Sequence, residues 1–311
     1  MSVVERALRK LQGTVPASAT RDESPIARTV TARTLNPKGE SSSAMQFHAA
    51  SGRAIDFDLD ALATAGLLAP GNERLADEYR GIKRPVLRKA AAHEASVESF
   101  VGIDRLVMVA SALPGEGKTF TSVNLSLSIA RERDWSVLLV DADCRNPSLS
   151  RLLGVAGEPG LLDYLKDPSK GMESFVLPTN IERLYILPRG SSDEHAAELL
   201  ASERMHTACT ALAAGEFGNF VVIFDSSPLL LTPEPVIISG HIGQVILVIQ
   251  SGQTSRPAVA DAIGRLDDNK AIGLVLNKAA ARDLVSSYSY GYSYSSYGKP
   301  SEAPSQSEQE L

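Results

Sequence analysis

The stretch from Arg105 to Phe120 decides the fold and reads Arg-Leu-Val-Met-Val-Ala-Ser-Ala-Leu-Pro-Gly-Glu-Gly-Lys-Thr-Phe. Its residues 106–110 form an apolar run typical of a buried strand. Turn-forming residues follow, and a helix is expected directly after them. This order of strand, loop and helix predicts a phosphate-binding loop. Backbone N–H groups in a glycine-rich turn and at a helix N-terminus attract phosphate oxygens.

Two side chains at the end of this loop carry its expected chemistry. Lys118 is placed to reach the β- and γ-phosphates of a nucleotide, and Thr119 to ligate Mg²⁺. The usual pattern begins with glycine where this chain has Ala112, so the match is to the relaxed form. The alternative is a glycine-rich turn with a surface lysine, but the flanking strand and helix favour nucleotide binding. The expected nucleotide contacts are Pro114, Gly115, Glu116, Gly117, Lys118, Thr119 and Phe120.

Composition narrows the class of protein. The 311 residues have room for one large α/β domain with an appendage, or for two domains. The net charge of −6 gives no overall attraction to nucleic acid or acidic lipid. Cys144 and Cys209 are the only cysteines, which fits a reducing cytosol. There is neither a membrane-length apolar run nor a signal-like N-terminus, so we expect a soluble, cytoplasmic protein without a nucleic-acid partner.

The two ends of the chain differ in composition from its middle. Residues 1–12 suit a short amphipathic helix, and residues 13–55 have the polar, aperiodic composition of a flexible linker. Residues 285–311 are expected to be a disordered tail, because they are rich in Tyr and Ser and poor in aliphatic side chains. Of the eight tyrosines, five lie in this tail: Tyr288, Tyr290, Tyr292, Tyr294 and Tyr297.

Residues 56–102 are expected to form a helical extension of the main domain. It should contain a short helix at 58–62 and a charged helix at about 72–83, which ends before Pro85.

The main domain, residues 103–284, alternates between strand and helix. Its expected strands are rich in Val, Ile and Leu without polar alternation, as in parallel strands covered on both faces. They are 106–110, 137–140, 184–187, 221–224, 245–249 and 272–276, and the expected helices are 119–130, 196–213 and 257–266. This alternation predicts a doubly wound, mostly parallel α/β sheet that binds its ligand beyond the carboxyl ends of the strands.

Three carboxylates follow buried strands. Asp141 and Asp143 come after the strand at 137–140, and Asp225 comes after the strand at 221–224. If these strands lie beside the P-loop strand, the carboxylates converge on the Mg²⁺–phosphate end of the nucleotide. A single aspartate at such a position is more often a structural cap. Two such junctions together with a P-loop favour a catalytic site.

These motifs together resemble the bacterial tyrosine (BY) kinases, a P-loop family with a MinD/ParA-like fold. Ala-Ser-Ala-Leu-Pro-Gly-Glu-Gly-Lys-Thr resembles their Walker A motif, Val-Asp-Ala-Asp-Cys-Arg-Asn-Pro their A′ motif and Phe-Asp-Ser-Ser-Pro their Walker B motif. Ser227 stands where the Walker B motif of the family usually has the first proline of a Pro-Pro pair. The opening Val-Val-Glu-Arg-Ala-Leu and the phrase Asp-Glu-Tyr-Arg-Gly-Ile-Lys-Arg-Pro resemble the soluble subgroup of autokinases associated with exopolysaccharide and exosortase loci.

The resemblance implies an ATP- and Mg²⁺-dependent autokinase whose tail tyrosines are phosphorylated in trans and which regulates exopolysaccharide polymerisation and export. Lys118, Asp141, Asp143 and Asp225 would be catalytic, with Asp141 as the candidate base for the incoming tyrosine. Thr119, Asp143 and Asp225 would hold the metal ion. Arg145 would steady the phosphates or the acidic cluster, or form only a surface salt bridge. Asn277 would contact adenine or cap the end of its strand.

The resemblance also implies partners. The family's helical oligomerisation motif Glu-x-x-Arg-x-x-Arg aligns with Asp77, Arg80 and Lys83, which suggests a homo-oligomer such as a ring. Lysine lacks the planar fork that pairs with a carboxylate through two hydrogen bonds. A membrane polysaccharide co-polymerase and a cognate tyrosine phosphatase are the other implied partners, and the kinase would be peripheral at the inner membrane.

Three other classes compete with this interpretation. A MinD/ParA-like ATPase switch without kinase activity shares the motifs, but those ATPases carry a signature lysine where this chain has Leu113. An iron–sulfur carrier ATPase would need cluster cysteines, which this sequence lacks. A nucleotide-gated scaffold with a merely adhesive tail is the non-enzymatic alternative.

Overall fold

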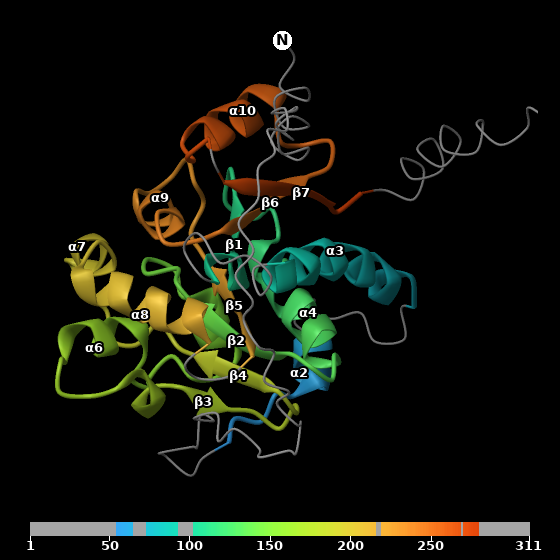
Figure 1. The fold of residues 1–311 in the computed structure, drawn as a ribbon. Coiled ribbons are helices and arrows are strands. Elements are labelled where there is room, and N and C mark those ends of the chain that lie inside the picture. The colour runs from blue at the N-terminus through green and yellow to red at the C-terminus, as the bar shows by residue number, and fades with distance from the viewer. Residues whose placement is uncertain (1–53, 65–72, 93–101, 216–218, 269, 280–311) are drawn as a thin grey trace, which may run out of the picture. The chain divides into compact units, whose positions relative to one another are not determined.

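The computed structural model describes residues 54–64, 73–92, 102–215, 219–268 and 270–279 (Figure 1). The described residues up to Asn277 belong to one compact unit, and Lys278 and Ala279 belong to a second. The predicted helix at 1–12, nearly all of the predicted linker and the tyrosine-rich tail lie outside the described residues.

The elements of the first unit alternate between helix and strand, as the sequence predicts. The helical elements are α2 (Leu59–Thr64), α3 (Glu73–Ala92), η2 (Ile103–Arg105), α4 (Lys118–Ala130), α5 (Ser148–Leu152), α6 (Leu161–Lys166), η3 (Met172–Ser174), α7 (Ala196–Leu200), α8 (Glu203–Ala214), α9 (Glu234–Ser239) and α10 (Arg256–Gly264). The strands are β1 (Leu106–Ser111), β2 (Ser136–Asp141), β3 (Leu177–Pro178), β4 (Leu184–Leu187), β5 (Phe220–Asp225), β6 (Gln244–Gln250) and β7 (Ala271–Asn277).

The strands form one seven-stranded sheet in the order β3-β4-β2-β5-β1-β6-β7. All neighbours are parallel except β3 and β4. The six predicted strands are confirmed. The sequence did not predict β3, because two residues are too few to show a period. Ile55 pairs with Thr179 beside β3, and its N–H donates to the Pro178 carbonyl at 2.8 Å.

Helices cover both faces of the sheet, so the predicted doubly wound fold is confirmed. Alternate residues of β1 point to opposite faces: Leu106 and Met108 enter one core, and Val107 and Val109 the other. The first core lies under α6, α7, α8, α9 and α10, and the second under α2, α3 and α4 (Figure 1). Buried on both faces, the central strands have the continuous apolar sequence from which they were predicted.

Helix α3 corrects one prediction, because it continues through Pro85 to Ala92 instead of ending before the proline. A proline inside a helix removes a backbone hydrogen bond and costs about 3 kcal/mol. Val86 and Ala90, which lie beyond Pro85, are buried in the core beneath α3 and α4. Burial of this second half of the helix offsets the cost. The proline alone therefore predicted the wrong C-terminal end for α3.

A second correction concerns the helix predicted at 196–213. The structure divides this segment into α7 and α8, with a break at Ala201 and Ser202. The backbone of Ser202 is extended, and its hydroxyl accepts a hydrogen bond from the Met205 N–H at 3.3 Å. Ser202 is therefore the N-cap of α8. The apolar spacing continues across the break, so periodicity alone did not show it.

Candidate nucleotide and phosphoryl-transfer site

Three adjacent strands bring the predicted site residues to one edge of the sheet. In the parallel register, Val109 of β1 pairs with Asp225 at the end of β5, and Asp225 pairs with Asp141 at the end of β2. The loop after β1 is the predicted P-loop. The strand order therefore places this loop and both carboxylates together, as predicted, with β5 between β1 and β2.

The P-loop enters helix α4 through Gly117, whose φ of 101° favours glycine. A Cβ atom here would lie 2.0 Å from Nδ2 of Asn277. That amide donates instead to the backbone carbonyl of Glu116 at 2.9 Å. Asn277, for which the sequence suggested an adenine contact or a strand cap, thus lies against the P-loop backbone.

The side chain of Glu116 braces the loop from within. It is 3% exposed and accepts a hydrogen bond from the Leu113 N–H at 2.8 Å and another from the Thr254 hydroxyl. Thr254 lies between β6 and α10, so two segments distant in sequence hold the P-loop in shape. A loop fixed before its ligand arrives loses little conformational entropy on binding.

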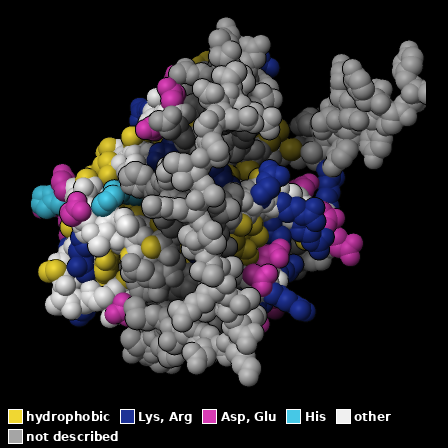
Figure 2. Space-filling view, in the orientation of Figure 1, with side chains coloured by type: hydrophobic (Ala, Val, Ile, Leu, Met, Phe, Trp, Pro, Cys, Tyr) yellow, Lys and Arg dark blue, Asp and Glu magenta, His cyan; other side chains and the backbone are white. Residues whose placement is uncertain are grey.

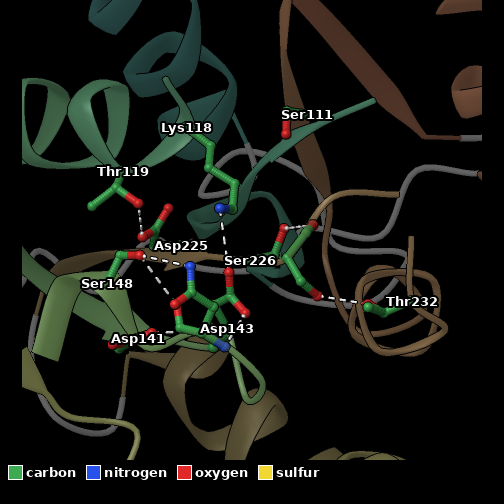
Figure 3. Close-up of polar contacts among 12 residues, drawn as sticks. Ser111, Lys118, Thr119, Asp141, Asp143, Ser148, Asp225, Ser226 and Thr232 are labelled. Atoms are coloured by element: carbon green, nitrogen blue, oxygen red, sulfur yellow. Dashed lines mark hydrogen bonds and ion pairs between the residues drawn. The ribbon is translucent and has the colours of Figure 1, made fainter. Parts of the chain in front are cut away.

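Lys118 and Thr119 both face carboxylates at the strand ends (Figure 3). The ammonium group of Lys118 lies 3.2 Å from Oδ2 of Asp143, and both side chains are nearly buried. The Thr119 hydroxyl donates to Oδ2 of Asp225 at 2.8 Å. The four residues that the sequence placed around the phosphates and the metal therefore meet in two direct contacts.

Asp225 lies at the floor of this group. It is 1% exposed, and its second oxygen accepts a hydrogen bond from the Ser122 hydroxyl at 3.0 Å. Burial raises the pKa of Asp225 from 3.8 to about 7, although the charge of Lys118 lowers it. A nearby cation would stabilise the ionised carboxylate.

Asp141 is held more firmly than a free catalytic base. Its Oδ2 accepts hydrogen bonds from the backbone N–H and the hydroxyl of Ser150, both at 2.7 Å, and its Oδ1 accepts one from the Asp143 N–H at 3.2 Å. Burial raises the pKa of Asp141 from 3.8 to about 6, and the Ser150 hydrogen bonds limit the rise. To accept a proton on Oδ2, Asp141 would have to weaken a bond from Ser150.

The A′ segment continues from Asp143 to Arg145. Oδ1 of Asp143 accepts a hydrogen bond from the Asn146 N–H at 3.0 Å, which closes a tight turn. Arg145 extends from this turn and donates through Nε to Oε1 of Glu234 at 3.3 Å. Arg145 therefore contacts a carboxylate outside the predicted acidic cluster.

The remaining predicted residues are placed as follows. Pro114 and Gly115 are exposed in the P-loop. The ring of Phe120 packs against Tyr79 of α3, with 6.4 Å between the ring centroids. The five tail tyrosines lie outside the described residues.

Sequence reasoning missed four residues that support the site: Ser122, Ser150, Thr254 and Glu234. Ser122 lies one helical turn after Thr119, and this spacing could have indicated it. Ser150 contacts Asp141 from nine residues away and Thr254 contacts Glu116 from 138 residues away, and no local signal marks either residue. Glu234 follows Asp225 of the Walker B motif by nine residues, in a Pro-Glu-Pro sequence typical of a turn.

The donors at this edge suit Mg²⁺ only with help from phosphates. The described residues contain no group of three or more His, Cys, Asp and Glu side chains that could hold a metal ion. Proteins commonly bind Mg²⁺ with one or two carboxylates and the phosphates of the substrate. The Thr119 hydroxyl and the Asp143 and Asp225 carboxylates are donors of this kind, and they would hold Mg²⁺ beside a bound nucleotide.

The fold and the site define a P-loop nucleotide-binding protein. No family model matches the chain. The tyrosine-protein kinase YwqD of Bacillus subtilis (strain 168) is 34% identical over 199 residues, which cover 62% of this chain and 80% of YwqD. The chain therefore belongs to the bacterial tyrosine kinase family.

Two solved kinase domains are similar in structure and sequence. The VpsO kinase domain is 29% identical with a TM-score of 0.51, covering 65% of this chain and all of that domain. The BceF tyrosine kinase domain is 26% identical with a TM-score of 0.55, covering 70% of this chain and 86% of that domain. Within the described residues, no helix has both the length and the apolar character needed to cross a membrane.

Proposed function

We propose that this protein transfers the γ-phosphoryl group of ATP to tyrosine hydroxyls, and that the tyrosines of its own tail are the acceptors. The observation that carries the proposal is the meeting of Lys118 with Asp143 and of Thr119 with Asp225 at one edge of the sheet. Membership of the tyrosine kinase family supports the choice of acceptor. The tail places five tyrosines within ten residues of sequence.

Catalysis rests mainly on positioning and charge, because phosphoryl transfer passes through a loose transition state. Lys118 would bind the β- and γ-phosphates, and Thr119, Asp143 and Asp225 would hold Mg²⁺, which neutralises charge on the transferred group. Asp141 is the proposed base for the tyrosine hydroxyl, whose pKa is about 10 when free. Its own pKa of about 6 suits a base that works near neutral pH.

Transfer is proposed to occur between subunits. The first tail tyrosine follows β7 by about ten residues, and an extended chain covers about 3.3 Å per residue. The tail is thus long enough to reach the site of a neighbouring copy. Phosphorylation of all five tyrosines would add about −1.5 to −2 charges for each, and only this full modification is expected to weaken binding of the tail beside an acidic cluster.

The assembly is proposed to use helix α3, although not in the way that the family motif suggests. Asp77 and Arg80 pair with each other on the helix surface. Lys83 is only 8% exposed, because it donates to the Ser128 carbonyl at 2.9 Å and pairs with Glu132 at 2.6 Å. An interface on α3 would therefore rely on its exposed arginines. Figure 2 shows Lys and Arg side chains gathered over this helix.

The sequence phrases shared with the soluble subgroup support a place in exopolysaccharide polymerisation and export. A cytoplasmic kinase with this task would be recruited to the inner membrane by a polysaccharide co-polymerase, and a tyrosine phosphatase would reverse its reaction. If the partner acts by tightening ATP binding, ATP must tighten partner binding by the same factor. Titrating the partner's cytoplasmic peptide with and without ATP tests this coupling, and equal affinities would exclude it.

The second candidate is an ATPase switch without kinase activity. It is favoured only by the motifs that both classes share, and Leu113 stands where those ATPases have their signature lysine. The product formed from ATP separates the two candidates. Phosphotyrosine indicates a kinase, and free phosphate alone indicates a switch.

The test incubates the purified protein with labelled ATP and compares it with Lys118→Met. Lys166→Met is a control, since Lys166 pairs with Asp163 and Asp193 away from the P-loop. We expect label on tyrosine in wild type and in the control, and none in Lys118→Met. Mixing Lys118→Met with a protein that has an intact site but lacks the five tyrosines should label the Lys118→Met chain. Undiminished phosphotyrosine in pure Lys118→Met would exclude the assigned site.

A further inference from the structure

The side chains of the ion pair formed by Arg145 and Glu234 differ greatly in solvent exposure. The Arg145 side chain is 68% exposed, whereas that of Glu234 is 6% exposed, and they meet through Nε and Oε1 at 3.3 Å. Oε2 of Glu234 is buried and has no hydrogen-bond partner among the described residues. A buried carboxylate thus faces one exposed guanidinium group at the rim of the site.

Glu234 is ionised despite its burial. Burial alone would raise the pKa of its carboxyl group, but hydrogen bonds from the Thr232 side chain and the Glu234 backbone, followed by the hydrogen bond and the charge of Arg145, outweigh that effect and lower it. The anchored Nε leaves the terminal nitrogens of Arg145 able to donate, since the described residues offer them no other hydrogen bond or ion pair. An arginine oriented in this way matches the geometry of a phosphate group.

An ordinary surface ion pair would not have this form. When both partners are exposed, each side chain moves freely and the pair contributes little. Here Glu234 is fixed in the first turn of α9, so it can hold the exposed arginine in one orientation. Because Oε2 has no partner among the described residues, it could accept a second hydrogen bond from the guanidinium group when Arg145 engages a ligand.

On the basis of the proposed kinase function, the geometry points to Glu234 as a positioning residue that holds Arg145 to bind a phosphate group at the rim of the site. Lys118 and Asp143 are 12% and 4% exposed, and they form the floor. The greater exposure of Arg145 favours a phosphate carried by the substrate peptide over one carried by ATP.

The tail sequence offers such a phosphate. Tyr288, Tyr290, Tyr292 and Tyr294 alternate with small residues, so consecutive tyrosines in an extended chain lie about 7 Å apart on one side. A phosphate already added to one tyrosine would then reach the rim while the next tyrosine occupies the floor. The site would prefer a tail that is already partly phosphorylated.

The experiment measures binding, so it does not depend on phosphoryl transfer. Labelled peptides covering residues 288–294, either unmodified or phosphorylated at Tyr290, are titrated against the full chain, and a fluorescent ATP analogue is titrated separately. The variants are Arg145→Gln, Glu234→Gln and the double variant. Glu194→Gln is the matched control, because Glu194 is 89% exposed. Denaturation midpoints establish that each variant is folded.

We expect wild type to bind the phosphorylated peptide about tenfold more tightly than the unmodified one, as for one charge-assisted contact. Arg145→Gln should abolish this preference and Glu234→Gln should reduce it, while the double variant should match Arg145→Gln. Weaker binding of the ATP analogue with an unchanged peptide preference would support the same pair and assign the phosphate to ATP.

Two results would overturn the inference. One is that Arg145→Gln changes neither the peptide preference nor the affinity for the ATP analogue. The other is that Glu234→Gln has the same effect with and without Arg145, since Glu234 would then not act through it. Repeating the titration in Lys118→Met separates the two proposals, because the preference should persist in a protein that transfers no phosphate.

Discussion

Replacing Asp225 with asparagine should stabilise the protein without nucleotide and metal, even though it removes a proposed ligand. The Asp225 carboxyl group has its pKa raised from 3.8 to about 7 by burial. Each unit by which the folded pKa exceeds the unfolded pKa corresponds to about 1.4 kcal/mol, so the ionised carboxylate destabilises the fold by about 4 kcal/mol above pH 7. Asparagine retains the shape but has no charge to bury.

The sign of the pH dependence follows from the raised pKa. Between about pH 4 and pH 7 the native state binds more protons than the unfolded state, so wild-type stability falls as the pH rises. Asp225→Asn lacks this contribution. We therefore expect the difference in free energy of unfolding, Asp225→Asn minus wild type, to increase by about 2–3 kcal/mol as the pH rises from 5 to 8.

The assay is urea unfolding of both proteins at pH 5, 6.5 and 8 with EDTA present. Asp261→Asn, at an exposed position of α10, is the control and should track wild type at every pH. A stability difference between Asp225→Asn and wild type that is the same at pH 5 and pH 8 would refute the burial argument. With Mg²⁺ and nucleotide added, wild type should gain more stability than the variant, because only the carboxylate supplies a charged ligand.

Three further outcomes test the contacts that support the site. Gly117→Ala should lower nucleotide affinity at least about tenfold in a binding titration, because its Cβ would lie 2.0 Å from Asn277 and its φ is 101°. Lys83→Met should lower the free energy of unfolding by about 1–3 kcal/mol, because the last turn of α4 loses a buried donor. Ser150→Ala should shift the acid limb of the phosphotransfer pH profile upward, because Asp141 loses a hydrogen bond to its ionised form.

Much of the site was predictable because its motifs are local. Lys118 and Thr119 follow a buried strand and glycine-rich turn within one short stretch, and Asp141 and Asp225 each follow an apolar run directly. Parallel strands that are buried on both faces have a continuous apolar sequence, which can be recognised without knowledge of their neighbours. The loop and carboxylates could therefore be assigned to one edge before their partners were known.

The helix ends were less predictable, because local signals compete with packing. Pro85 marks a break in the sequence, yet the core beneath α3 holds the helix together through Ala92. In the segment after β4, the apolar spacing continues although Ser202 caps a new helix. In both cases the free energy that decides the outcome comes from contacts outside the segment.

The sequence by itself determined the fold class, the phosphate-binding loop and the acidic strand ends, since each depends on residues adjacent along the chain. Only the tertiary structure decided which distant side chains form hydrogen bonds and ion pairs with the residues of the site. Ser122 reaches Asp225 across 103 residues, Glu234 reaches Arg145 across 89, and Asn277 reaches the P-loop across 161. No periodicity encodes such pairs. They exist because the strand order brings distant segments to one edge of the sheet. Burial there strengthens each hydrogen bond and each interaction between charges.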